Sequence, residues 1–374
     1  MPRAIVSGTG LYTPPYAITN EQLVASFNEY VAQFNRENAA AIAAGQVVAR
    51  EPSDVSFIES VSGIKSRYVI ESEGVLDPKR MRPHFPKRPD NALSLQAELC
   101  VQAARAAMEQ SGRSAADIDA VIVACANMQR AYPAMAIEVQ NALGIQGFAY
   151  DLNVACSSAT FGIQAACNAV ESGSARAVLM VNPEITSAHL NFKDRDSHFI
   201  FGDVCTAVIV ERDEPRERKD SYEILSTRLQ TQFSNNIRNN FGFMNRCEDT
   251  DPLGEDKLFV QQGRKVFKDV VPMVIKLLGE HLADNKLAPQ DLKCLWLHQA
   301  NIKMNQLIVQ KLLGREATQA EAPTILDEYA NTASAGSIIA FHKHREHMKV
   351  GDLGVICSFG AGYSIGNVLV RKIS

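Results

Sequence analysis

Three short fragments of the chain each place one chemically capable side chain at the end of an apolar or β-prone run. They are Cys156 in NVACSSATFG, His298 in WLHQAN and Asn331 in EYANTASAGS. A cysteine thiolate is a strong nucleophile, an imidazole donates and accepts protons, and a carboxamide donates hydrogen bonds without competing for a proton. Together they predict a cysteine nucleophile with two partners that handle a proton and an oxyanion.

Each of the three residues also has a structural interpretation. Cys156 precedes a helical pattern, and a helix N-terminus lowers the pKa of a thiol from about 8.5 toward roughly 3.5 to 7.5, which predicts a thiolate at neutral pH. A small buried apolar side chain is the alternative. His298 ends a strand, where a neutral imidazole suits developing negative charge, but a lone histidine is more often structural. Asn331 fits a helix N-cap equally well.

The segment SFGAGYS, from Ser358 to Ser364, is a tight turn of mostly small residues that follows the apolar run VIC near the end of the chain. Glycine lets the backbone approach a ligand closely, so N–H groups of this turn are candidates for half of an oxyanion hole. An ordinary turn between two strands is the alternative.

The elements that must position these fragments occur twice. A helical pattern from 92 to 109 is followed by a break and the strand AVIVACAN. The same order returns 174 residues later, with a helical pattern from 266 to 280, a break and CLWLHQAN. Gly173 and Gly351 match as turn glycines 178 apart. Helices alternating with buried strands predict an α/β protein, and the duplication predicts five αβαβα layers around one cleft. Chance likeness is the alternative. We expect an N-terminal half at 1–212 and a C-terminal half at 213–374.

Composition narrows the class of protein. The 374 residues carry a formal net charge of -4, which gives no general reason to expect nucleic acid or an anionic membrane as partner. No apolar run reaches the roughly 20 residues of a membrane span, and the N-terminus lacks a secretory pattern. The 8 cysteines show no paired spacing, which argues against disulfides and a metal site. A cytoplasmic enzyme without a metal is expected.

Two stretches lie outside the repeat. Residues 21–50 begin with a possible capping box from Thr19 to Gln22 and continue with apolar residues at helical spacing, which predicts a long surface or interface helix. Residues 71–90 are rich in proline and in basic residues and predict a loop.

The motifs VACSSATFG, HQAN, YANTASAGS and FGAGYSIG, in this order, resemble the thiolase-fold condensing enzymes, and among them the β-ketoacyl-acyl-carrier-protein synthase III branch. The resemblance extends over nearly the whole chain. It implies a thiolase-like fold, a homodimer, and two substrates, acyl-coenzyme A and malonyl-acyl carrier protein, with no cofactor. It also implies that Cys156 becomes acylated and that the enolate of decarboxylated malonyl then attacks the acyl group to form a β-ketoacyl product.

The resemblance further implies a role for particular residues. His298 and Asn331 would bind the malonyl thioester oxygen, and the backbone N–H groups of Cys156 and Ala361 would bind the tetrahedral oxyanion. Substrate contacts are implied at the following residues: Arg195, Phe57, Phe201, Asn301 and Tyr132, the last reaching across a dimer interface. Lys303 occupies the place of a basic residue that docks the acidic carrier protein.

The chain departs from the family at the nucleotide clamp. Phe57 and Val61 stand where the family usually has a tryptophan and an arginine, whereas Arg195 matches the other stacking arginine. An incomplete clamp predicts weak binding of coenzyme A or a different acyl donor. The alternatives to the condensing enzyme are an acyltransferase or condensing enzyme of a specialised lipid or secondary-metabolite pathway, a cysteine hydrolase, and a silent scaffold.

Overall fold

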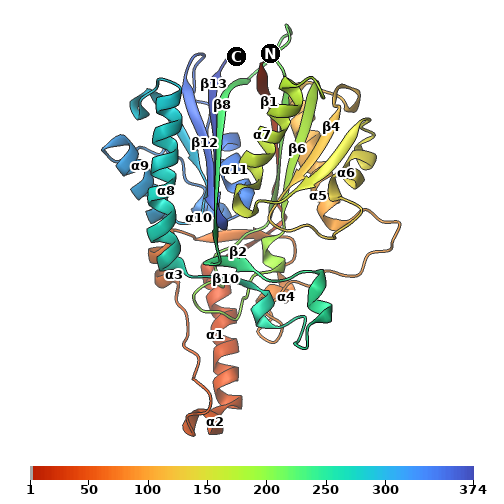
Figure 1. The fold of residues 1–374 in the computed structure, drawn as a ribbon. Coiled ribbons are helices and arrows are strands. Elements are labelled where there is room, and N and C mark those ends of the chain that lie inside the picture. Colours follow the sequence, from red (N-terminus) through yellow and green to blue (C-terminus); the bar gives the residue numbers. More distant parts are fainter. Residues whose placement is uncertain (1–2) are drawn as a thin grey trace.

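The computed structural model describes residues 3–374 and contains one large mixed sheet with helices on both faces (Figure 1). Its nine strands follow the order β11-β12-β13-β8-β1-β7-β6-β4-β5. The strands are β1 (Ala4–Tyr12), β2 (Tyr16–Thr19), β3 (Ser66–Val69), β4 (Ala120–Ala124), β5 (Phe148–Leu152), β6 (Ala177–Glu184), β7 (Val204–Arg212), β8 (Tyr222–Ser234), β9 (Ile237–Asn239), β10 (Phe259–Gln261), β11 (Leu292–Leu297), β12 (Leu353–Gly360) and β13 (Gly362–Lys372). The helices are α1 (Asn20–Glu37), α2 (Ala39–Ala43), α3 (Val55–Ser62), α4 (Glu73–Leu76), α5 (Leu95–Ser111), α6 (Met135–Leu143), α7 (Ser158–Glu171), α8 (Gly263–Asp284), α9 (Ile302–Leu313), α10 (Leu326–Tyr329) and α11 (Gly336–Lys343).

The sheet consists of two parts that meet between β1 and β8. Only the pairs Ile5–Glu223 and Val6–Tyr222 join these two strands, whereas β1 pairs with β7, and β8 with β13, along most of their length. The two strand layers expected from the duplication are therefore two parts of one sheet, joined at one short antiparallel contact.

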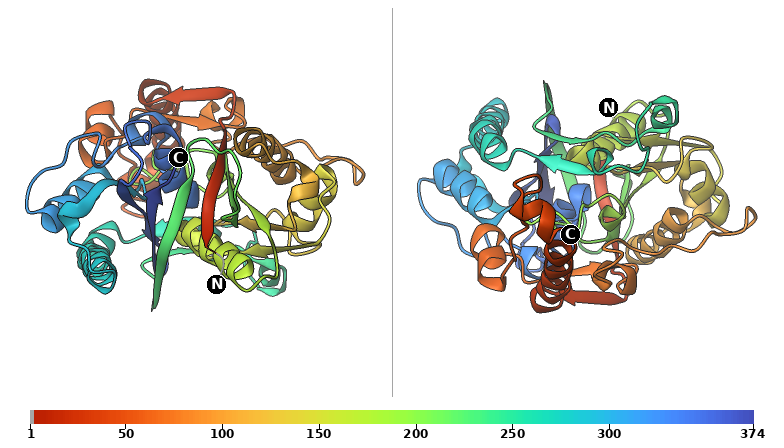
Figure 2. Two further views of the ribbon diagram at one scale, coloured as in Figure 1. Left: turned by 90° about the horizontal axis from the view of Figure 1, so that it is seen from above. Right: turned by 90° about the horizontal axis from the view of Figure 1, so that it is seen from below.

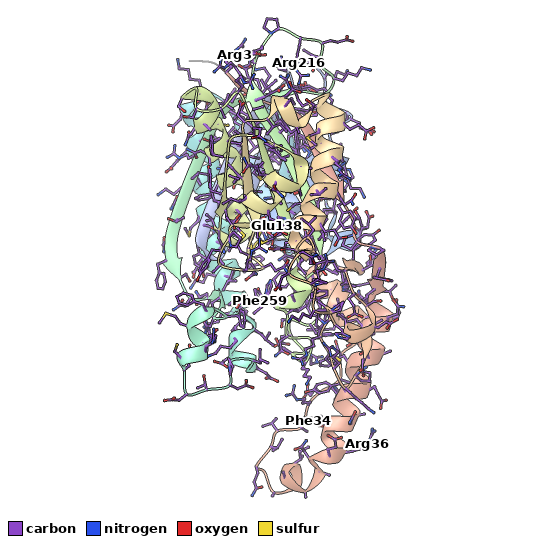
Figure 3. The ribbon with its side chains drawn as sticks, turned by 90° about the vertical axis from the view of Figure 1, so that its right-hand side faces the viewer. Arg3, Phe34, Arg36, Glu138, Arg216 and Phe259 are labelled. Atoms are coloured by element: carbon purple, nitrogen blue, oxygen red, sulfur yellow. The ribbon has the colours of Figure 1, made fainter. Side chains whose placement is uncertain are left out.

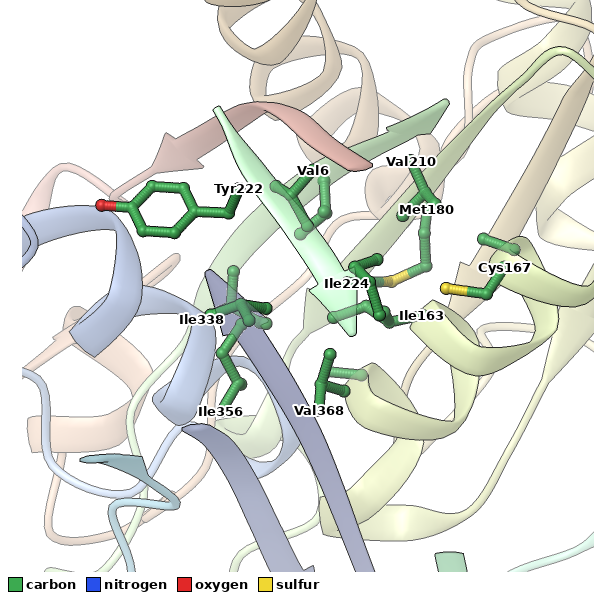
Figure 4. Packing of buried hydrophobic residues seen from close by; sticks show 14 of the residues in the cluster. Val6, Ile163, Cys167, Met180, Val210, Tyr222, Ile224, Ile338, Ile356 and Val368 are labelled. Carbon is green, nitrogen blue, oxygen red and sulfur yellow. The ribbon is translucent and has the colours of Figure 1, made fainter. Parts of the chain in front are cut away.

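Alternation along the strands divides the apolar side chains among three cores, because successive strand residues point to opposite faces. In β6, Leu179 and Val181 face α5 and α6, while Val178 and Met180 face α7. The strands of the other part are divided in the same way. Side chains on one face pack against α8 and α9, and side chains on the other face belong to the shared central core. Side chains of both parts, such as Met180 and Ile356, meet in that central core with α7 and α11 (Figure 4). The outer helices lie on opposite sides of the strands (Figure 2), which confirms the five-layered αβαβα prediction.

Backbone geometry repeats at the predicted offsets. The 3₁₀ turns 115–117 and 289–291 are 174 residues apart, and α7 and α11 begin 178 residues apart. Ala155 and Ala333 each lie three positions before the helix that follows them, and they have positive φ angles of 45° and 46°. The duplication therefore extends to individual strained residues.

The two stretches outside the repeat agree with expectation in part: the helix expected over 21–50 is divided at Asn38 into α1 and α2, and residues 44–50 are not helical. The side chain of Thr19 accepts from Gln22 N, and the Gln22 side chain accepts from Thr19 N, so the predicted capping box begins α1. The far part of α1, which carries Phe34 and Arg36, projects from the body together with α2 (Figure 3). Segment 71–90 contains the short helix α4 and irregular chain. Within residues 3–374, no helix is long and apolar enough to span a membrane.

We predict that Gly10→Ala destabilises the fold by about 1–3 kcal/mol, the usual cost of overpacking a core. A Cβ at Gly10 would lie 2.0 Å from Ala103 O and 2.7 Å from Ala107 N, which are backbone atoms of α5 that cannot turn aside. Gly279→Ala is the matched control, because a Cβ there meets nothing within 4 Å and lies within α8. The control should be neutral or more stable by about 0.5–1 kcal/mol. Urea unfolding measures both, and equal stabilities of the two variants would contradict the packing argument.

Candidate active site

The turn that carries Cys156 is held by a neighbouring asparagine. Asn153 Oδ1 accepts a hydrogen bond from Ala155 N at 2.9 Å, which supports the positive φ of Ala155. Cys156 then lies in the 3₁₀ turn 155–157 that leads into α7, so its own backbone N–H is at the start of a helix. This is the predicted strand-to-helix junction.

Asn331 uses its backbone and side-chain oxygen to fix the equivalent turn of the other half. Its N–H donates to Ile200 O at 3.0 Å, and its carbonyl accepts from Gly202 N at 3.1 Å, so the residue is bridged in parallel to Phe201. Asn331 Oδ1 accepts from Ala333 N at 2.9 Å. The side-chain oxygen of Asn331 therefore has the structural role expected of a helix cap. The Nδ2 donor takes no part in this contact.

His298 follows β11 in a buried position. Its backbone N–H donates to Cys357 O at 2.7 Å, and its ring meets Phe359 edge to face at 5.3 Å between centroids. The residue is 2% exposed, and burial lowers the pKa of its imidazole to about 4, with the Ala333 backbone opposing part of that change. The imidazole is therefore neutral at pH 7.

The end of β12 brings the three turns together. A Cβ on Gly360 would lie 2.5 Å from Cys156 Cβ and 2.9 Å from Cys156 Sγ, so only glycine fits against the cysteine here. The next residue, Ala361, lowers the pKa of Cys156 through a backbone hydrogen bond. His298 is attached to the same strand at Cys357 and lies against Ala333, two residues beyond Asn331.

The predicted acidification of Cys156 is wrong for the protein without substrate. Burial and, second, the Glu184 carboxylate raise the pKa of the thiol to about 12, although the backbone N–H groups of Ala361 and Cys156 lower it. A helix terminus contributes about 0.3–1 kcal/mol. Each pKa unit corresponds to about 1.4 kcal/mol, so desolvation exceeds that contribution. The cysteine is a thiol in the free site.

The two expected nucleotide-clamp residues are stacked on each other. The guanidinium carbon of Arg195 lies 4.4 Å from the centroid of the Phe57 ring, and Arg195 Nε donates to Pro52 O at 2.8 Å. A flat base between them would need about 7 Å, twice the optimal contact distance of about 3.5 Å. The clamp is therefore closed in this structure, and Val61 contributes only its carbonyl, which accepts from Asn301 Nδ2 at 2.5 Å.

Phe201 is close to the reactive residues, and Asn301 serves a helix. Phe201 packs against Phe259 at 4.7 Å between ring centroids and is bridged to Asn331. Asn301 Oδ1 accepts from the backbone N–H groups of Lys303 and Met304, so its side chain caps α9. Both the oxygen and the nitrogen of the Asn301 side-chain amide therefore make hydrogen bonds that hold the fold.

The two residues expected to contact proteins lie at the surface. Lys303 is exposed in the first turn of α9 and lines a cavity of about 400 Å³. Tyr132 is 84% exposed and precedes Pro133 in the segment that leads into α6.

A larger cavity of about 910 Å³ lies beside the site. Phe259 forms part of its wall and also contacts Phe201, which connects the cavity wall to Asn331. The cavity is lined by residues of α1, of the chain from 50 to 51, of the segment 191–197 and of the segment 255–264, among them Arg195.

Two residues of the site were missed in the sequence. Glu184 ends β6 and is buried beside the Cys156 and Asn331 turns. Asn153 has the same turn-supporting role as Asn331. The 178-residue offset already relates these two asparagines, and a carboxylate that ends an apolar strand was the signal for Glu184. Within residues 3–374, no group of three or more potential ligands is placed to hold a metal ion.

The duplicated five-layered fold, with a cysteine, a histidine and an asparagine on neighbouring turns, is that of a thiolase-fold condensing enzyme. Residues 150–232 match the family model of 3-oxoacyl-[acyl-carrier-protein] synthase III, and residues 282–372 match that of its C-terminal domain. The chain belongs to the β-ketoacyl-[acyl-carrier-protein] synthase III family and is an acyl-transferring condensing enzyme of fatty acid synthesis. Family membership removes the hydrolase and scaffold alternatives.

Relatives and solved structures agree with this assignment. The chain is 62% identical to the β-ketodecanoyl-[acyl-carrier-protein] synthase of Pseudomonas aeruginosa, over 93% of this chain and 99% of the relative. It is 25% identical to a β-ketoacyl-[acyl-carrier-protein] synthase III of Granulibacter bethesdensis, over 99% and 100%. The fold is similar to the 3-oxoacyl-[acyl-carrier-protein] synthase III of Aquifex aeolicus (TM-score 0.76, 23% identity, covering 98% and 99%). It is also similar to the priming β-ketosynthase of the R1128 polyketide pathway (TM-score 0.77, 23% identity, covering 99% and 96%).

Proposed function

We propose that Cys156, His298 and Asn331 carry out a decarboxylative Claisen condensation in two half-reactions. In the first, Cys156 Sγ attacks the carbonyl carbon of an acyl-coenzyme A, the thiol proton leaves with the coenzyme A sulfur, and an acyl-cysteine forms. In the second, malonyl on acyl carrier protein loses carbon dioxide, and its enolate attacks the acyl-cysteine. The cysteine sulfur leaves, takes up one proton, and a β-ketoacyl-acyl carrier protein is released.

The contact of Gly360 with Cys156 is the observation that carries this proposal. It brings the N–H of Ala361 toward the cysteine, and with the N–H of Cys156 this forms a donor pair for the tetrahedral oxyanion. Losing one such donor costs about 3–4 kcal/mol in enzymes with similar sites. The neutral His298 and the Nδ2 of Asn331 donate to the malonyl thioester oxygen as it gains charge, and neither adds a charge that the enolate must displace.

The acyl donor that we propose is octanoyl-coenzyme A. The similar Pseudomonas protein is named for a β-ketodecanoyl product. Condensation with malonyl leaves two malonyl carbons in the product, so the matching primer is octanoyl. Because Phe57 and Arg195 are stacked on each other, we expect one of two positions for the nucleotide of coenzyme A. It lies in the adjacent 910 Å³ cavity, or it separates the two side chains as it enters.

Acyl transfer can be tested by incubating the protein with acyl-coenzyme A of two to sixteen carbons and measuring intact mass. We expect one acyl adduct, formed fastest with octanoyl, and release of β-ketodecanoyl-acyl carrier protein after malonyl-acyl carrier protein is added. Cys156→Ala should form no adduct. The reaction should be unchanged in EDTA, because no metal is required. Absence of an adduct at every chain length would refute the proposal.

Replacing Asn331 by aspartate separates its two roles. Asn331→Asp keeps the oxygen that accepts from Ala333 N but removes the Nδ2 donor, so the fold and the octanoyl adduct should remain while carbon dioxide release from malonyl-acyl carrier protein falls about 100-fold or more. Asn153→Asp is the matched control in the other half, where the side chain supports the Cys156 turn, and it should retain decarboxylation to a much larger extent. Normal decarboxylation by Asn331→Asp would leave this residue with its turn-supporting role alone.

The protein partners that we propose are a second copy of the chain and the acyl carrier protein. Strand β5 is at the edge of the sheet, and Phe148 and Tyr150 stack on its exposed face with parallel rings, near exposed Ile137 of α6. An open edge with exposed aromatic residues is typical of a pairing surface, and Tyr132 would then reach toward the partner. Lys303, exposed at the start of α9, is our candidate for docking the acidic carrier.

Sedimentation equilibrium tests both partners in one experiment. The protein alone should have the mass of a dimer, and acyl carrier protein should add to it. Lys303→Glu should keep the dimer and lose most of the carrier binding, whereas Lys311→Glu, on the same helix, is the matched control and should bind normally. A monomer at all concentrations would refute the dimer, and normal carrier binding by Lys303→Glu would refute the docking site.

We also propose two halves, 1–212 and 213–374, since β7 ends at Arg212 and β8 begins the strand set of the second half at Tyr222. The first contributes Cys156, and the second contributes His298 and Asn331. We further propose a cytoplasmic location, for which the free cysteines of the described residues are suited, and catalysis without a cofactor.

A further inference from the structure

A buried carboxylate lies between the two catalytic turns and has no part in the reaction as written above. Glu184 ends β6 and is 1% exposed. Its Oε1 accepts from Ser334 Oγ at 2.5 Å and from Ser334 N at 3.2 Å, and its two oxygens accept from Ala126 N at 3.1 and 3.2 Å. Burying a carboxylate is costly, so a side chain held here by donors from both halves requires an explanation.

The hydrogen bonds of Glu184 continue to both reactive residues. On one side, Ser334 follows Ala333, whose N–H donates to Asn331 Oδ1. On the other side, the Ala126 carbonyl accepts from Asn153 Nδ2 at 2.9 Å, and Asn153 Oδ1 accepts from Ala155 N, the residue before Cys156. Hydrogen bonds, joined by short covalent links at Ala333–Ser334 and within Ala126, therefore connect the Asn331 turn through Glu184 to the Cys156 turn.

Glu184 also acts on Cys156 through its charge. The carboxylate raises the pKa of the Cys156 thiol, and burial raises the pKa of Glu184 itself to about 7. The other titratable groups around it are Cys125 at the end of β4, whose pKa Glu184 also raises, and neutral His298 behind the Ala333 turn. Asp203, which precedes β7 beside β6, is bonded instead to Ser187 and to Ile70 N.

We propose that Glu184 is a positioning residue that holds the Asn331 turn against the Cys156 turn and keeps Cys156 in the thiol form until an acyl donor binds. The inference rests on the proposed roles of Cys156 and Asn331. It assigns two separable properties to one side chain. Its charge adds to the effect of burial on the Cys156 thiol, and its reach to Ser334 sets the position of the Asn331 turn.

Two substitutions separate charge from reach. Glu184→Gln keeps the length of the side chain and removes its charge, whereas Glu184→Asp keeps the charge and shortens the reach to Ser334. Ser334→Ala removes one donor and leaves the carboxylate in place, so it serves if either Glu184 variant fails to fold, which circular dichroism will show. Glu171→Gln, at the exposed end of α7, is the control for loss of a carboxylate.

The first readout is the rate at which iodoacetamide alkylates Cys156 between pH 6 and 10. Peptide mass follows the reaction, because the exposed Cys247 would react as well. This assay needs no acyl substrate. Glu184→Gln should be alkylated about tenfold faster than wild type at pH 8, a displacement of the profile by about one pH unit toward acid. Glu184→Asp, Ser334→Ala and Glu171→Gln should follow the wild-type profile. A Glu184→Gln profile equal to wild type would overturn the role of the charge.

The second readout is carbon dioxide release from malonyl-acyl carrier protein by the acylated enzyme. Glu184→Asp and Ser334→Ala should lose about tenfold in kcat with little change in KM, because the substrate is bound but the Asn331 donor is displaced. Unchanged kcat in both variants would overturn the positioning role. If wild type forms no acyl adduct, the proposed function fails, and the alkylation profiles still decide whether Glu184 controls Cys156.

Discussion

The site depends on two strained turns that must face each other. Ala155 and Ala333 both have positive φ angles close to 45°, a conformation that costs a residue with a side chain of order 1–3 kcal/mol. Each turn is supported by the side-chain oxygen of an asparagine two residues earlier, Asn153 or Asn331. Because the strain is local, the rest of the fold must hold the turns in place. The shared central core and the joined strands β1 and β8 supply that support.

Burial then determines the charges that the site carries. His298 is neutral and Cys156 is a thiol, so neither residue carries charge in the free protein, and the buried carboxylate beside them is Glu184. In a buried site of low dielectric, each dipole acts strongly on a charge that forms during the reaction. In the proposed reaction, the enolate and the tetrahedral oxyanion are such charges, and the proposed donors are fixed by the backbone and by the Asn331 turn.

The sequence was sufficient for the parts of the molecule that depend on local pattern. Helical and strand periods, repeated at a nearly constant offset, predicted the five layers, and the Thr19 capping box was visible as a short motif. Properties that arise from tertiary contacts were not accessible. The thiol state of Cys156 follows from burial and from Glu184, the stacking of Phe57 on Arg195 follows from how α3 meets the segment near 195, and the capping role of Asn301 follows from the start of α9.

Ala155 and Ala333 occupy equivalent turns of the two halves, yet the chain has one nucleophile. The residue after Ala155 is Cys156, and the residue after Ala333 is Ser334. Two copies of the same turn thus present a sulfur in one half and a hydroxyl bonded to a carboxylate in the other. The two halves therefore share the same backbone turn but differ in the side chain that it carries. One half has the nucleophile, and the other has a hydroxyl that supports the site.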